Sequence, residues 1–111
     1  MAYDDELADR IRVLIGDRAV GLTEQKMFGG LAFLIGGNMA IAASGQGGIL
    51  VRVDPEESDK LVATTPAEPM EMRGRSMAGW LRVDTADVAD DATLAEWVEH
   101  GTAYASSLPP K

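Results

Sequence analysis

The sequence predicts an α+β fold, a two-layer sandwich in which helices cover one face of an antiparallel sheet. The expected elements follow the order helix, three strands, helix, two strands, helix. This order lacks the regular alternation of strand and helix that builds a parallel sheet. Two apolar runs, 31–35 and 38–43, also flank the pair Gly36-Gly37, and this pattern is typical of a β-hairpin because tight hairpin turns need positive φ.

The first element is a helix from Asp5 to about Ile15, because apolar residues recur there at helical spacing and acidic residues open the first turn. Gly16 ends it. A polar connection is expected next, followed by an antiparallel meander of three strands. The predicted strands are 31–35, 38–43 and 49–53, with turns at 36–37 and 44–48.

The second helix is expected to begin with Asp54 as N-cap and Pro55 at its first position, and to run to about Ala63. Residues 69–74 and 79–84 alternate apolar and polar, which predicts two more strands joined by 75–78. The last helix is expected to start at a capping box formed by Thr93 and Glu96, and the prolines at 109–110 end it.

Strand periodicity assigns side chains to the two faces of the sheet. The face expected under the helices carries Leu31, Phe33, Ile35, Met39, Ile41, Ile49, Val51, Val53, Met70, Met72, Leu81 and Val83. The opposite, open face is expected to carry Ala32, Leu34, Ala40, Ala42, Leu50, Arg52, Glu71, Arg73, Trp80 and Arg82. This second face is half apolar and half basic in a chain whose formal charge is −8, so it is the most informative surface that the sequence predicts.

The composition of the chain disfavours several classes of function. The 111 residues suit one domain, 1–111. Eighteen acids against 10 bases disfavour direct nucleic-acid binding, and the absence of cysteine removes disulfides and thiolate chemistry. The acidic start lacks a signal-peptide pattern, which predicts a cytoplasmic protein. The apolar stretch 27–43 contains four glycines and is shorter than the roughly 20 residues that a membrane helix needs.

No pattern in the sequence predicts an enzyme, a cofactor or a metal. The glycine pairs match neither a P-loop nor a dinucleotide fingerprint, since no helix follows them at the required spacing. His100 is the only histidine, and Glu96 four residues earlier predicts a surface pair rather than a catalytic or metal site. The serines lack a nucleophile elbow.

The stretch 72–82 holds Arg73, Arg75 and Arg82 without an acid among them. Two interpretations are open. The arginines are paired with some of the many carboxylates of the protein, or they form a site for an anion or an acidic peptide with Trp80 as aromatic anchor.

Several strings along the whole chain resemble the N-terminal domain of the TfoX/Sxy family. They are KMFGGLAF (26–33), the Asn-Met pair at 38–39, LVRV (50–53), PMEMRGRSMAGW (69–80) and AYASSLPPK (103–111), and the opening MAYDDELADRIR is similar to the first helix of that family. The matching positions are Lys26, Met27, Phe28, Gly29, Gly30, Arg52, Met70, Arg75, Met77, Gly79 and Trp80.

The resemblance implies a small α+β domain of the secretion-chaperone-like, YjbR-like class, without catalytic residues. Full-length members resemble regulators of natural competence that act with the cyclic-AMP receptor protein, and they carry a second, helical domain. A sequence ending at Lys111 lacks that second domain, so we expect a stand-alone domain of the TfoX N-terminal type.

Two hypotheses of function follow, together with a question of assembly. The first is a non-enzymatic domain that docks on a protein partner, such as a transcription regulator. The alternative is a module that binds a small molecule or anion through Lys26 and Arg75 near the glycine turns. The open face could also form a homodimer. The candidate interaction surface comprises Lys26, Phe28, Gly29, Gly30, Arg52, Arg73, Arg75, Trp80 and Arg82.

Overall fold

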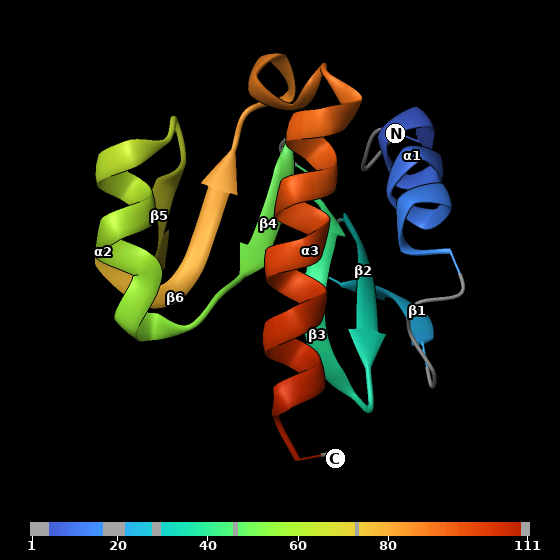
Figure 1. The fold of residues 1–111 in the computed structure, drawn as a ribbon, viewed down its shortest axis with the longest axis horizontal. Helices are drawn as coiled ribbons and strands as arrows, with labels where there is room; N and C mark the ends of the chain where they lie inside the picture. The colour runs from blue at the N-terminus through green and yellow to red at the C-terminus, as the bar shows by residue number, and fades with distance from the viewer. Residues whose placement is uncertain (1–4, 17–21, 28–29, 46, 73, 110–111) are drawn as a thin grey trace.

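Helices and strands form an α+β arrangement in the computed structural model, which describes residues 5–16, 22–27, 30–45, 47–72 and 74–109 (Figure 1). The elements are α1 (Asp5–Ile15), β1 (Leu22–Met27), β2 (Gly30–Ile35), β3 (Asn38–Ala43), β4 (Ile49–Arg52), α2 (Pro55–Thr64), β5 (Glu68–Met72), β6 (Arg75–Val83), the 3₁₀ turn η1 (Thr85–Val88) and α3 (Asp91–Ser107). The six strands form one antiparallel sheet in the order β1-β2-β3-β4-β6-β5. The predicted fold class is confirmed.

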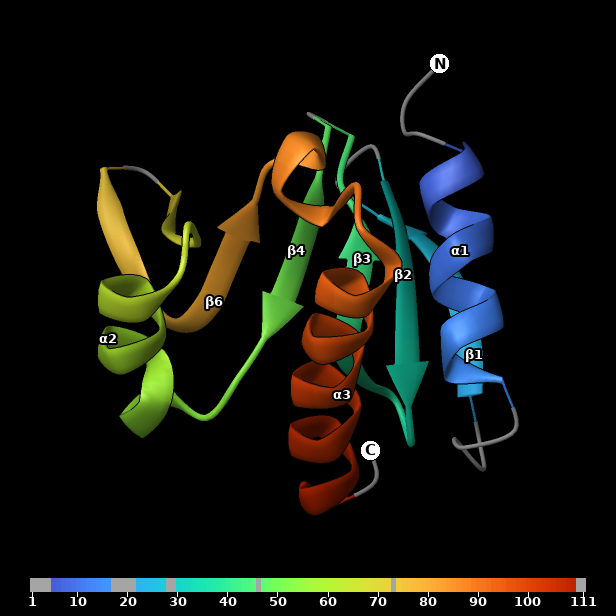
Figure 2. The same ribbon diagram turned by 45° about the horizontal axis from the view of Figure 1, so that its top comes forward.

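All three α-helices lie on one face of the sheet (Figures 1 and 2). Helix α3 packs across β3 and β4, α2 packs on β6, and α1 lies beside α3. The main core fills the space between the two layers, and burying each large aliphatic or aromatic side chain there contributes about 1.5–3 kcal/mol. Its fully buried large residues include Leu7, Ile11, Ile15, Phe33, Ile41, Ile49, Val51, Leu81, Leu94 and Val98.

Helix ends follow the predicted chemistry in two cases out of three. Helix α1 ends at Ile15, and Gly16 follows it at a φ of 52°. Asp54 caps α2, because its side chain accepts a hydrogen bond from the backbone N–H of Glu56 at 2.9 Å. The predicted start of α3 is wrong: the helix begins at Asp91, and its N-cap is Asp90, whose carboxylate accepts from the N–H of Thr93.

One strand was not predicted. The expected polar connection before residue 31 contains β1, which pairs antiparallel with β2 from Leu22 opposite Ile35 to Met27 opposite Gly30. Its residues Thr23, Glu24 and Gln25 are exposed, and a polar strand at the edge of a sheet shows no apolar alternation. The predicted Gly36-Gly37 hairpin turn between β2 and β3 is confirmed, with both glycines at positive φ.

The turn between the last two strands also lies earlier than predicted. Residues 75–78 belong to β6 rather than to a connection, and Met72 pairs with Arg75 at the end of the hairpin. Strand β6 therefore extends over nine residues, Arg75–Val83.

A bulge in β3 changes the predicted faces. Phe33 pairs with Ile41 and Leu34 pairs with Met39, so Ala40 is an extra residue in the ladder. An extra residue reverses the alternation beyond it. As a result Met39 packs on the open side of the sheet and Ala40 packs in the main core, the opposite of the prediction for both.

A second irregularity corrects the prediction for Met70. Pro69 pairs with Leu81, whereas Met70 pairs with Met77, so β6 has extra residues between these pairs. Gly79 lies in this segment at a φ of 84°, and its carbonyl accepts from the N–H of Val53 at 2.7 Å. Met70 consequently packs with the open-side residues instead of under the helices.

Candidate functional site

The side of the sheet that carries no helix holds a second apolar cluster. We call this side the open face. Its buried members come from β2, β3 and β4, and partly buried Met70 and Trp80 pack against them. The buried residues are Ala32, Leu34, Met39, Ala42 and Leu50. Ala32, Leu34, Ala42, Leu50 and Trp80 lie on the face predicted for them.

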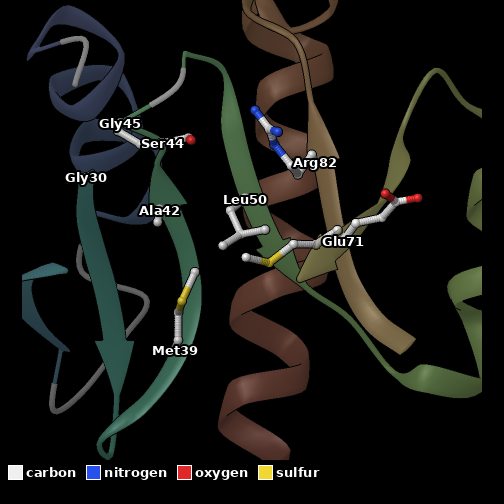
Figure 3. A pocket seen from close by; sticks show the side chains of 10 residues that line it. Gly30, Met39, Ala42, Ser44, Gly45, Leu50, Glu71 and Arg82 are labelled. Atoms are coloured by element: carbon white, nitrogen blue, oxygen red, sulfur yellow. The ribbon is translucent and has the colours of Figure 1, made fainter. Parts of the chain in front are cut away.

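A hollow with a volume of about 110 Å³ lies on the open face (Figure 3). Met39, Ala42, Leu50 and Met70 supply apolar lining, and Arg82 and Glu71 contribute polar groups. The other lining residues are Gly30, Ala43, Ser44 and Gly45. Strands β3 and β5 both line the hollow although β4 and β6 separate them in the sheet, so the sheet curls around it.

Four side chains form a block beside the hollow. On β4 and β6, Leu50 lies opposite Arg82 and Arg52 lies opposite Trp80. Residues two apart on a strand share a face, so Arg52 and Arg82 are diagonal neighbours in this block. The sequence placed Arg52, Trp80 and Arg82 on one surface, and the strand register brings them together.

Two aromatic rings lie close to the guanidinium group of Arg52. Its guanidinium carbon lies 5.1 Å from the ring centroid of Trp80 and 5.6 Å from that of Tyr104, which α3 provides. Each such cation–π contact contributes about 0.5–1 kcal/mol when partly exposed. Tyr104 was not among the predicted site residues, because only the packing of α3 against β4 reveals that it is close to Arg52.

Arg52 and Arg82 form no ion pair and no side-chain hydrogen bond within the described part of the chain. Glu68 lies opposite Arg82 in the β5–β6 ladder and Glu71 lines the same hollow, but neither carboxylate pairs with Arg82. Arg10 and Arg12 differ, because Arg10 pairs with Asp91 at 2.8 Å and Arg12 pairs with Glu24 at 2.7 Å. The open-face arginines therefore retain free N–H donors.

Among the described residues, the two groups with a shifted pKa, Arg12 and Glu24, lie on the helix-covered side of the sheet. The Arg12 guanidinium donates two hydrogen bonds of 2.7 Å to the Glu24 carboxylate and holds the pKa of that carboxyl below its usual value. The same hydrogen bonds raise the pKa of Arg12, which also bonds Asp9. Arg12 lies 5.9 Å from the ring centroid of Phe33. This pair joins α1 to β1 and β2.

The sequence pattern of the TfoX N-terminal domain matches residues 17–105, which is most of the chain. The chain belongs to the TfoX N-terminal domain family. No curated protein and no solved structure matches the chain significantly. The resemblance inferred from the sequence strings is thus confirmed at the level of the family.

Two positions of the TfoX N-terminal domain strings have a structural role here. A Cβ atom at Gly30 would lie 2.3 Å from the carbonyl oxygen of Ala43, which real side chains do not tolerate. The close approach of two backbone segments therefore requires glycine at position 30. Asn38 is buried, and its side-chain amide donates to the Pro109 carbonyl at 2.9 Å, which holds the end of α3 against the β2–β3 turn.

Two further predicted site residues of this TfoX N-terminal domain that the structure describes, Lys26 and Arg75, do not line the hollow. Lys26 is exposed on β1, and Arg75 is exposed at the start of β6. Three strands separate β1 from β6 in the sheet, and the two strands lie far apart in Figure 2. Phe28, Gly29 and Arg73 lie outside the described residues.

Two kinds of feature are absent from the described residues. They include no group of three His, Asp or Glu side chains placed to hold a metal ion. They include no helix that is both long and apolar enough to span a bilayer. His100 is half-buried on α3 with its ring centroid 5.7 Å from that of Trp97, which is a packing contact.

Proposed function

We propose that this TfoX N-terminal domain is a non-enzymatic cytoplasmic module that docks on a protein partner through the open face. The observation that carries the proposal is the pair Arg52 and Arg82, which form no ion pair within the described residues and lie beside a largely apolar hollow in a chain of net charge −8. Arginine and tryptophan are the residue types that most often dominate binding energy in protein interfaces.

The family suggests the kind of partner. TfoX-type proteins resemble regulators of competence, so we propose a component of transcription regulation as the partner. The domain would act as an accessory protein and leave DNA contact to that partner, because its net charge of −8 repels phosphates.

A capture experiment with a surface variant tests this function. The tagged wild-type domain and a Trp80→Ala/Arg82→Glu variant would be compared for crosslinked partners in cells that express the domain naturally. Lys60→Glu, on exposed α2, reverses a charge on the helix side as a control. The proposal predicts a protein captured by wild type and by the Lys60 variant but lost with the double variant.

Identical partner sets for all three proteins would contradict the proposed surface. Since Trp80 packs against the open-face cluster, its loss could also unfold the domain. Thermal melting of each variant, and a single Arg82→Glu variant that keeps the tryptophan, separate a lost contact from a lost fold.

A second candidate is a module for a small molecule or anion, and the hollow beside Arg82 is the observation that favours it. Its volume of about 110 Å³ is below the roughly 300–1,000 Å³ of ordinary ligand pockets, so only a small anion would fit. A bound ligand raises the melting temperature by linkage. No stabilisation by millimolar phosphate or small carboxylates would eliminate this candidate.

A further inference from the structure

The spacing of the two open-face arginines indicates the chemistry of what they bind. In an antiparallel pair, diagonal neighbours lie about 7–8 Å apart, with slightly less between their Cβ atoms, and Arg52 and Arg82 are such neighbours. Two like charges at this distance repel each other, and neither guanidinium forms an ion pair with a carboxylate of the described residues, including Glu68 opposite Arg82 and Glu71 at the hollow. A ligand with two negative charges at matching spacing would relieve this repulsion.

An extended peptide offers that spacing. Along a strand each residue advances about 3.3 Å and alternate side chains share a side, so acids at positions one and three lie about 7 Å apart. Each guanidinium can hold a carboxylate through two parallel N–H donors. The rings of Trp80 and Tyr104 already restrict Arg52, which lowers the entropy lost on binding.

The hollow beside the arginines suits one apolar side chain of the same peptide. A cavity of about 110 Å³ holds the volume of only a few water molecules at about 30 Å³ each. Met39, Leu50 and Met70 make its lining adaptable, because methionine side chains repack easily.

We propose that Arg52 and Arg82 bind an extended segment of a protein partner with the pattern acid–any residue–acid, and that a neighbouring aliphatic side chain enters the hollow. The inference rests on the proposed function and adds the sequence class of the partner. A short segment fits better than a long polyanion such as nucleic acid, because the net charge of −8 repels the latter.

Fluorescence anisotropy with synthetic peptides tests the motif. The probe is fluorescein-labelled Gly-Leu-Asp-Ala-Glu-Leu-Gly, and the comparison peptides are its Asn/Gln counterpart and an isomer with the two acids adjacent. At low salt we expect the probe to bind at least about tenfold more tightly than the neutral peptide, as two charge-assisted pairs imply. The isomer should bind more weakly than the probe.

Variants of the domain assign the effect to the two arginines. Arg52→Gln and Arg82→Gln should each weaken probe binding about five- to tenfold. Lys60→Gln, which removes a charge from exposed α2, should change it less than about twofold. Arg82→Lys keeps the charge but loses the paired donors, so it should bind with intermediate affinity. Melting curves show that each variant is folded.

Three results would overturn the proposal: no probe binding at millimolar concentration, equal binding of acidic and neutral peptides, or equal losses from Lys60→Gln and Arg82→Gln. Competition by inorganic phosphate as effective as that by unlabelled probe would also overturn it, because the site would then recognise a single anion. If peptides fail while capture still depends on Trp80 and Arg82, the motif is wrong and the docking function stands. If capture is independent of both, the docking function itself fails.

Discussion

Arg12 on α1 and Arg82 on β6 show how the contacts of the same side chain differ with its place in the fold. Arg12 lies across Phe33 and is held by Glu24 and Asp9, so it stabilises the packing of α1 on the sheet. Arg82 lies beside Leu50 at the hollow and forms no ion pair among the described residues, although Glu68 lies opposite it in the β5–β6 ladder. The sequence shows both as arginines in an acidic chain, and it leaves open which carboxylates are close enough to pair.

The Arg12–Glu24 pair predicts a pH dependence of stability. Arg12 lowers the pKa of Glu24 in the folded state, so the stabilisation is present above the unfolded value of about 4.3 and is lost as pH falls through the folded pKa. Glu24→Gln should reduce the free energy of unfolding at pH 7 by under about 1 kcal/mol, since both side chains are partly exposed.

Urea unfolding of wild type and the Glu24→Gln variant between pH 7 and pH 3 checks this. The difference in unfolding free energy should shrink as the pH falls below about 4. A difference that stays constant across this range would show that the charge of Glu24 is not what stabilises the domain.

A second prediction concerns Gly101, where α3 crosses the bulge of β3. A Cβ atom at this position would lie 2.4 Å from the carbonyl oxygen of Ala40. Helix propensity alone predicts that Gly101→Ala stabilises by about 1 kcal/mol. The close contact predicts the opposite sign, a loss of about 1–3 kcal/mol as in other overpacked cores.

Chemical denaturation of Gly101→Ala separates the two expectations, with Ala103→Gly at an exposed site of the same helix as the matched control. The control should lose about 1 kcal/mol through propensity alone. Stabilisation by Gly101→Ala would mean that α3 does not approach β3 as closely as described.

At the scale of elements, the sequence predicts what local patterns encode. The amphipathic pattern of α1, the Asp54 cap and the Gly36-Gly37 turn depend on neighbours in the chain, and all three are present. Strand β1 and the bulge at Ala40 depend on pairing with a distant segment, so periodicity missed both. Because the prediction did not include the bulge, it assigned Met39 to the wrong face of the sheet.

The cap of α3 gives a test at this scale. The Asp90 carboxylate accepts hydrogen bonds from both the N–H and the hydroxyl of Thr93, so Asp90→Ala should cost about 1 kcal/mol of unfolding free energy. Glu96→Gln should cost almost nothing, because Glu96 lies beyond the first turn. If Glu96→Gln lowered the denaturant midpoint more than Asp90→Ala, the capping box predicted at Thr93 would be correct and the Asp90 cap would be wrong.

At the scale of the whole molecule, the helices cover one face of a curled sheet and leave the other without a helix (Figures 1 and 2). Part of the predicted surface is present, because the register of β4 with β6 brings Arg52, Trp80 and Arg82 together. Lys26 and Arg75, which were also predicted, lie on strands far apart in the sheet. Tyr104, which was not predicted, contacts Arg52 from helix α3. Such long-range neighbours follow from strand order, which no local pattern specifies.

The proposed role of the open face also predicts the oligomeric state of the domain. If a partner protein occupies the open face, the free domain should scatter light as a monomer of 11.8 kDa at high concentration. A stable dimer that dissociates on Arg82→Glu would instead assign the open face to a second copy of the chain.

The most direct test of docking at the open face is site-specific photo-crosslinking in cells. A benzophenone amino acid would replace Glu71 at the hollow or, as control, Lys60 on exposed α2. We predict that position 71 crosslinks to a different protein, that Arg52→Gln/Arg82→Gln abolishes this product, and that position 60 gives no such product. A partner crosslinked from position 60 alone, or one retained at position 71 without the two arginines, would contradict the account.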